Sequence, residues 1–240
     1  MEEVIQDKPL LLKAVEMIVS NPADIKKQVI AMENQYYEKY GGKKSKDQIQ
    51  ALMCEHIIKN YSYFTAFSGG VTALAGIVPG LGTLVSTLGG GTADAALCMK
   101  WQIEMVMAIA SIYGRDITNE EEKMICFMVA GLGAINEFGK NGFKNIGNKA
   151  FCNMIKQYLS GTTLQGVKQI FKQVGITFTQ KAALKAAPFG ISVIISSGAN
   201  KLLTKYVGSK AIAFYNPIGS CYENDIVTES DEGDFEASMA

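Results

Sequence analysis

Apolar residues recur at helical spacing along most of this chain. In residues 92–113 they stand three or four positions apart, at Leu97, Cys98, Trp101, Met105, Ala108 and Ile112. This spacing predicts a helix that ends at Gly114, where a left-handed backbone conformation costs little. No segment shows the alternation of apolar and polar residues between hairpin turns that is typical of β-strands. The pattern therefore predicts an all-α fold.

Local signals indicate where the other helices begin and end. Asn21 followed by Pro22 is typical of a helix start, and that helix is expected to stop at Gly41. Segments 45–48 (Ser-Lys-Asp-Gln) and 118–121 (Thr-Asn-Glu-Glu) have the spacing of a capping box, which predicts that a helix opens at each. Later helices are expected in the ranges 139–158, 163–174, 176–186 and 188–207.

Residues 60–93 form an unusual stretch of 34 residues without a formal charge, with eight glycines and with Pro79 near the middle. A transmembrane helix needs roughly 20 consecutive apolar residues, and the glycines and Pro79 break this stretch into shorter pieces. The uncharged residues 186–200 are also too short to span a bilayer. We therefore expect a multi-helix bundle around a glycine-rich apolar helical hairpin. The hairpin either packs inside the protein or dips partly into lipid.

The amino-acid composition indicates how the chain divides into domains. With 240 residues, 48% of them hydrophobic, the chain is long and apolar enough to form a core. The last 23 residues carry seven acids and no base, a composition typical of disorder. We expect one helical domain over residues 1–217 and a disordered acidic C-terminal tail over residues 218–240.

The same composition leaves little room for metal or redox chemistry. The chain has one histidine, and its five cysteines are never closer than 26 residues, so neither a His-rich metal site nor a CxxC motif is present. The glycine clusters do not continue into a phosphate-binding loop. We expect no cofactor and no bound metal, and the unpaired cysteines favour a reducing, cytoplasmic location.

Asp94 and His56 are the remaining candidates for a catalytic role. If Thr92 caps its helix, Asp94 lies in the first turn, where the helix dipole favours a carboxylate. The alternative is a buried acid paired with Arg115 or with a lysine. His56 lies two residues after Cys54, but no local signature marks the two as a catalytic pair. No residue is assigned a catalytic role.

Charge is distributed unevenly along the chain. Residues 61–217 carry a net charge of +7, and residues 138–222 contain eleven lysines and no acid. Like charges four residues apart destabilise a helix slightly, so these lysines need a counter-charge from lipid headgroups, another macromolecule or the acidic tail. Four such pairs are the candidate membrane-binding residues: Lys140 and Lys144, Lys168 and Lys172, Lys181 and Lys185, and Lys201 and Lys205.

Aromatic residues interleave with these lysines and are candidates for insertion at a membrane interface: Phe143, Phe151, Tyr158, Phe171, Phe178 and Phe189. The alternative is a solvated lysine surface over a core that contains the aromatics. The single arginine argues against sequence-specific recognition of nucleic acid, which depends on bidentate arginine contacts.

Several stretches match a known family: residues 69–76 (GGVTALAG), 79–82 (PGLG), 92–94 (TAD) and 109–116 (IASIYGRD), with 187–190, 198–200, 206–211 and Tyr215 near the C-terminal end. Together they resemble the EcsC family over residues 10–216. The motif positions are Gly69, Gly76, Pro79, Gly82, Asp94, Tyr113, Gly114, Asp116, Pro188 and Gly190. The resemblance implies an all-helical bacterial protein linked by name and context to an ABC transporter and to secretion. It implies no established catalytic activity.

These observations favour a non-catalytic helical module in the cytoplasm or at the inner face of the cell membrane. Its expected partner is an anionic membrane surface or a membrane protein complex. One alternative is a soluble protein-binding adaptor or homo-oligomer that uses the glycine-rich hairpin as its interface. A second is an enzyme that acts on a lipid or other amphiphile, with Asp94 as its acid.

Overall fold

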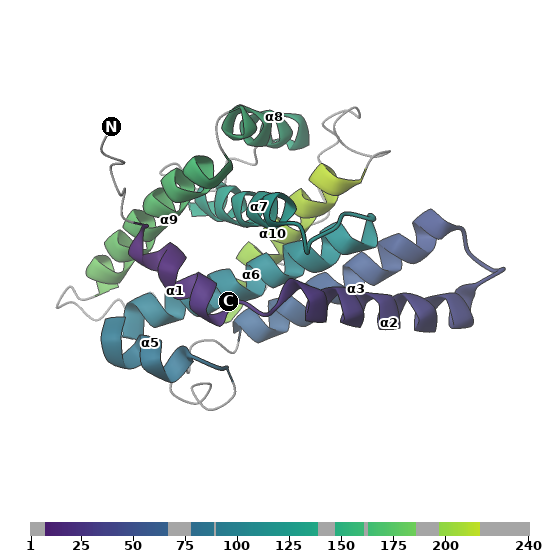
Figure 1. Cartoon of the computed structure of the whole chain (residues 1–240), viewed down its shortest axis with the longest axis horizontal. Coiled ribbons are helices and arrows are strands. Elements are labelled where there is room, and N and C mark those ends of the chain that lie inside the picture. Colours follow the sequence, from purple (N-terminus) through teal and green to yellow (C-terminus); the bar gives the residue numbers. More distant parts are fainter. Residues whose placement is uncertain are drawn as a thin grey trace, which may run out of the picture.

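In this computed structural model the described residues are 8–66, 78–88, 90–138, 147–160, 163–185 and 197–216. Every regular element within these ranges is an α-helix, which confirms the all-α prediction (Figure 1). The helices are α1 (Leu10–Ile18), α2 (Pro22–Tyr40), α3 (Lys46–Ala66), α5 (Leu81–Leu88), α6 (Gly90–Ile112), α7 (Glu120–Phe138), α8 (Asn148–Leu159), α9 (Thr163–Lys185) and α10 (Ser197–Tyr215).

Helix α6 lies at the centre of the bundle (Figure 1). Helices α1, α2, α3, α5, α7 and α10 all pack against it, and α9 packs mainly against α7. Among the described residues, one helix is long and apolar enough to cross a membrane, the part of α6 from Ala93 to Ile112. Other parts of the protein bury 89% of its most apolar window. In this fold the apolar length of α6 forms the core.

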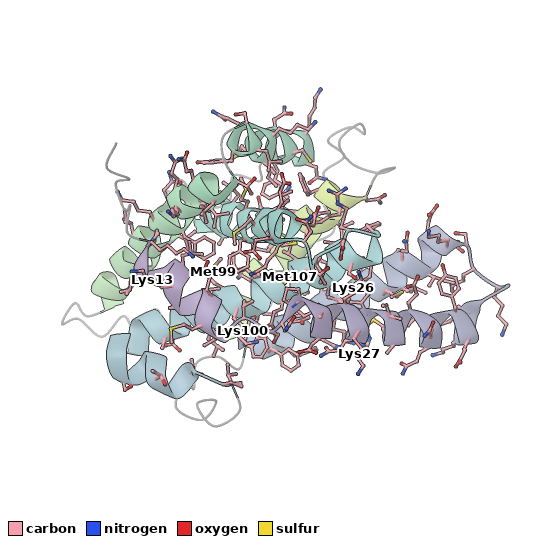
Figure 2. All side chains as sticks on the ribbon, in the orientation of Figure 1. Lys13, Lys26, Lys27, Met99, Lys100 and Met107 are labelled. Carbon is pink, nitrogen blue, oxygen red and sulfur yellow. The ribbon has the colours of Figure 1, made fainter. Side chains whose placement is uncertain are left out.

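The core around α6 and α7 is rich in methionine, whose flexible side chain fills irregular gaps. Met99 and Met107 lie along α6 in the interior of the molecule (Figure 2). Met105 and Met128 are also fully buried.

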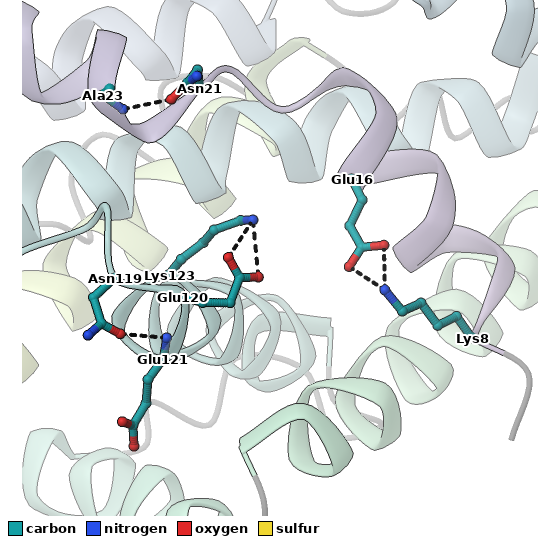
Figure 3. A network of polar contacts seen from close by, with 8 residues as sticks. All are labelled: Lys8, Glu16, Asn21, Ala23, Asn119, Glu120, Glu121 and Lys123. Carbon is teal, nitrogen blue, oxygen red and sulfur yellow. Dashed lines mark hydrogen bonds and ion pairs between the residues drawn. The ribbon is translucent and has the colours of Figure 1, made fainter. Parts of the chain in front are cut away.

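The predicted limits of α2 are confirmed. Asn21 Oδ1 accepts a hydrogen bond of 2.9 Å from the backbone N–H of Ala23, with Pro22 at the first helical position (Figure 3). The helix ends at Tyr40, and the following turn includes Gly42 with φ of +76°. A side chain at Gly42 would be strained in this left-handed conformation.

The predicted capping box of α3 is confirmed. Ser45 Oγ accepts a hydrogen bond of 3.3 Å from the backbone N–H of Gln48, and Gln48 Oε1 accepts one of 3.0 Å from the backbone N–H of Ser45.

The second predicted capping box is wrong. Helix α7 begins at Glu120, and its cap is Asn119, whose Oδ1 accepts a hydrogen bond of 2.8 Å from the Glu121 N–H (Figure 3). Thr118 instead donates its hydroxyl to Asp116 Oδ1 at 2.7 Å. Because the Thr118 hydroxyl bonds to Asp116, two residues earlier, Thr118 does not cap the helix.

Other helix limits also differ from the prediction. α10 continues to Tyr215, beyond the predicted end at residue 207. α9 runs without a break through Gly175, where two helices were expected, because the glycine lies in a helix held by packing on α7 and α1. α6 begins at Gly90, so Asp94 lies beyond the first turn and is exposed. The prediction that Asp94 lies in the first turn of its helix and the alternative that it is buried are therefore both wrong.

Much of the predicted glycine-rich hairpin lies outside the described residues, which omit 67–77. The described part includes α5, which packs against α6, and Gly80, which has φ of +81° just before α5. The predicted acidic tail, residues 218–240, also lies outside the described residues.

Candidate functional site

The structure places the described candidate lysines on two helices. Lys168 and Lys172 lie on α9, and Lys201 and Lys205 lie on α10. The two pairs stand on helices with different main packing partners, since α9 packs mainly against α7 whereas α10 packs mainly against α3 and also against α6 and α7. Lys172 and Lys205 are exposed, and the other two are half-buried. The side chains of Lys181 and Lys185 and the whole of Lys140 and Lys144 lie outside the described part.

The prediction that the interleaved aromatics insert into a membrane is wrong for Phe151 and Phe171. Both side chains are fully buried, and the Phe171 ring packs 5.8 Å from that of Phe127 in α7. Tyr158 is half-buried and packs against the core. Phe143, Phe178 and Phe189 lie outside the described side chains. The apolar face of each helix is used to pack α8 and α9 onto the bundle.

Three of the exposed large apolar side chains of the described residues lie close together in sequence, at the end of α3 and the start of α10. Lys201 Nζ lies 4.6 Å from the centre of the Tyr63 ring, a cation–π contact between the two helices. Around this contact lies a surface that we call the α3–α10 patch. It comprises Lys59, Tyr63, Phe64, Lys201, Leu202 and Lys205.

A buried ion pair lies in the middle of α6. Lys100 and Glu104 are 4% and 2% exposed and pair with each other (Figure 2 labels Lys100). Lys100 Nζ also lies 4.0 Å from the centre of the Trp101 ring. Burial lowers the pKa of the Lys100 ammonium, while the neighbouring Glu104 carboxylate acts in the opposite direction. The sequence signal was a Lys and a Glu four residues apart in an apolar helix.

The turn between α6 and α7 holds three of the motif positions, Tyr113, Gly114 and Asp116. Gly114 has φ of +79° and ends α6 as predicted. It lines two open hollows of about 340 and 350 Å³ on either side of the turn. The hydroxyl of Thr118 and, to a smaller extent, the ammonium of Lys26 lower the pKa of Asp116 to about 2.

Arg115 and Glu122 pair beside this turn. Arg115 donates two hydrogen bonds, of 3.0 and 2.6 Å, to Glu122 Oε2. This contact raises the pKa of the guanidinium further above its already high value. The predicted alternative partner of Arg115, Asp94, is exposed on the first half of α6. The Arg115–Glu122 pair joins the turn to α7.

One family model matches most of this chain. The model of the EcsC protein family matches residues 27–216, from α2 to the end of α10. The chain belongs to the EcsC family. Comparisons with curated proteins and with solved structures gave no match. The suspected resemblance is confirmed at the level of the family.

The described motif residues of this EcsC-family chain do not gather around one reacting centre. Pro79 lies just before α5 and Gly82 lies within it, and both are exposed. Asp94 is exposed on α6, whereas Tyr113, Gly114 and Asp116 lie at the opposite end of that helix. The other motif positions lie outside the described residues: Gly69, Gly76, Pro188 and Gly190.

The described cysteines of the EcsC-family chain are buried thiols. Burial raises the pKa of Cys54 to about 11 and those of Cys98 and Cys126 to about 12, so all three are protonated at neutral pH. His56 contacts Asn60 at 2.9 Å between its Nε2 and the amide Nδ2. Within the described ranges no group of three metal-ligating side chains is close enough to hold a metal ion.

Proposed function

We propose that this EcsC-family protein is a non-catalytic module that attaches reversibly to an anionic membrane surface through its lysine-rich half. The observation that supports this proposal is the position of the cations on α8, α9 and α10. Among the side chains that the structure describes, four of these cations are exposed, in a part of the sequence that contains no carboxylate: Lys149, Lys156, Lys172 and Lys205.

The ion pairs of the N-terminal half show the contrast. They join Lys8 to Glu16, Lys26 to Asp116, Lys100 to Glu104, Arg115 to Glu122 and Lys123 to Glu120 (Figure 3 shows the first and the last). All of these acids precede residue 124 in the sequence. Helices α8, α9 and α10 contain no acid of their own, so an external anion is the natural counter-charge for the exposed Lys149, Lys156, Lys172 and Lys205.

The expected attachment is weak per residue and sensitive to salt. Each lysine near an anionic membrane surface contributes about 1 kcal/mol, and the attraction falls off over a screening length of about 8 Å at physiological salt. A few exposed lysines therefore hold the protein at the surface without insertion of a helix.

Vesicle sedimentation across a salt series tests this proposal. The full chain is expected to sediment with vesicles that contain anionic phospholipid at low salt, to be released at high salt, and to ignore vesicles of phosphatidylcholine alone. Absence of sedimentation with anionic vesicles at low salt would refute the proposal, and so would equal binding to neutral vesicles. Retention only by membranes that contain protein would instead indicate a membrane protein as the partner.

Matched charge variants test which lysines contribute to vesicle binding. The double change Lys172→Gln and Lys205→Gln is expected to weaken binding about 30-fold, since it removes two contributions of about 1 kcal/mol each. The control is Lys27→Gln with Lys43→Gln, which removes two exposed lysines from the N-terminal half and changes the net charge equally. Equal weakening by both pairs would show that net charge alone acts.

A further inference from the structure

The α3–α10 patch combines exposed apolar side chains with cations. Tyr63, Phe64 and Leu202 are 44%, 49% and 43% exposed. Lys59 lies one turn before Tyr63 on the outer face of α3, and Lys205 lies one turn after Lys201 on α10. Large apolar residues that stay half exposed among lysines are typical of a surface that contacts another phase or partner.

Polar contacts hold the two halves of the patch in one arrangement. The buried Thr204 hydroxyl donates to Thr65 Oγ1 at 2.9 Å, and Thr65 Oγ1 donates to the Asn200 carbonyl at 3.4 Å. Two turns away, Gly208 of α10 lies directly against Ile58 of α3. The helices therefore run antiparallel in close contact, with the end of α3 beside the start of α10.

This arrangement joins the two uncharged stretches of the sequence. The uncharged residues 60–93 begin in the last turns of α3, and the uncharged residues 186–200 end in the first turn of α10. The described ends of both stretches, residues 60–66 and 197–200, thus lie next to the patch. On α3 the nearest acid, Glu55, lies two turns before Tyr63, and α10 contains no acid.

We propose that the α3–α10 patch is the surface that enters the interfacial layer of an anionic bilayer. Tyr63, Phe64 and Leu202 lie at the level of the headgroups and upper acyl chains, and the three lysines of the patch contact lipid phosphates. This inference rests on the proposed function and names the orientation of the docked protein. An anionic bilayer fits because the patch is both apolar and positively charged, which a purely apolar protein interface does not require.

The single tryptophan of the chain reports on the patch. The Trp101 ring centre lies 5.2 Å from that of Phe64, so the indole lies next to one side chain of the patch. The experiment uses the full chain and vesicles of phosphatidylcholine and phosphatidylglycerol with brominated acyl chains, which quench nearby tryptophan. Binding at low salt is expected to quench the Trp101 fluorescence, and high salt is expected to restore it.

A matched pair of variants tests the contact itself. The change Tyr63→Ser with Leu202→Ser is expected to weaken vesicle binding about tenfold through lost apolar contact. The control, Tyr37→Ser with Ile30→Ser, removes a tyrosine and an aliphatic residue that are 37% and 49% exposed on α2. It is expected to bind like the wild type. Circular dichroism confirms that both variants keep their helix content.

The outcomes separate this inference from the proposed function. If the wild type ignores anionic vesicles, the proposed function fails and this inference fails with it. If the wild type binds but Trp101 is not quenched, or if both variant pairs bind alike, the docking surface is elsewhere and the proposed function stands. A wild-type dimer in light scattering that the Tyr63→Ser and Leu202→Ser changes dissociate would overturn the inference in favour of a self-association surface.

Discussion

The carboxylate of Glu104, in the middle of α6, accepts a hydrogen bond of 2.7 Å from the backbone N–H of Ser20, at the junction of α1 and α2. The same oxygen pairs with Lys100, whose ammonium lies 3.4 Å from Ser20 Oγ. Both charged side chains are buried. The pair therefore attaches the α1–α2 junction to the central helix, 84 residues away in the sequence.

Removing one member of this pair is expected to be costly. Glu104→Leu leaves the buried Lys100 ammonium without its counter-charge, which should lower the free energy of unfolding by about 3–5 kcal/mol. The double variant Lys100→Met with Glu104→Leu removes both charges and should recover part of that loss. Urea unfolding followed by circular dichroism measures both values. A double variant less stable than Glu104→Leu would contradict this account.

Asp116 is expected to titrate near pH 2 in an NMR experiment because Thr118 and Lys26 donate hydrogen bonds to its carboxylate. Thr118→Val should raise this pKa towards 3.8, and Lys26→Gln should raise it less. Since the folded pKa is lower than the unfolded one, Asp116 contributes stability above about pH 4 that is lost as the pH falls towards 2. An unchanged pKa in Thr118→Val would show that another group lowers it.

The described thiols are expected to resist labelling in the folded protein. With Cys221→Ser to remove the cysteine outside the described part, a thiol reagent at pH 8 should modify almost no Cys54, Cys98, Cys126 or Cys152, all of which are buried. In denaturant all four should react rapidly. Stoichiometric labelling of the folded chain within minutes would place at least one thiol at the surface.

Two helical glycines are expected to respond oppositely to alanine. A Cβ at Gly131 of α7 would lie 2.5 Å from the buried Ile170 Cγ2 of α9, so Gly131→Ala should destabilise the fold by about 1–3 kcal/mol. A Cβ at Gly175 would meet the Leu11 Cβ at 3.9 Å, an ordinary contact. Gly175→Ala should therefore stabilise the fold by about 0.5–1 kcal/mol through helix propensity. Thermal unfolding of both variants distinguishes close packing from propensity.

Local sequence signals predicted helix starts correctly where the capping side chain bonds to a backbone group close by in the sequence. Asn21, Pro22 and the Ser45–Gln48 box mark the helix starts as predicted, because the groups that they bond lie within three residues. Thr118 failed for the same kind of reason, since Asp116, two residues before it, takes its hydroxyl. A break between two helices was expected at Gly175, but α9 is continuous there because packing on α7 overrides the low helix propensity of glycine.

The candidate site was only partly within reach of the sequence. The excess of lysine after residue 138 is visible by counting, and so are the two uncharged stretches. The burial of the aromatic side chains is not visible in the sequence. Phe151 and Phe171 are buried, whereas Tyr63 and Phe64 are about half exposed. The spacing of all four along their helices is compatible with either outcome. The buried Lys100–Glu104 pair was missed because a lysine and a glutamate four residues apart usually lie on an exposed helix face.

The amino-acid sequence by itself determined the helical class, the family and the separation of charge, because hydrophobic period, capping and composition are properties of neighbouring residues. Only the tertiary structure decided which apolar side chains form the core and which remain at the surface. That choice depends on which helices meet, and the Thr65–Thr204 contact brings together residues 139 positions apart. Burial is thus a property of the assembled bundle, and no single helix specifies it.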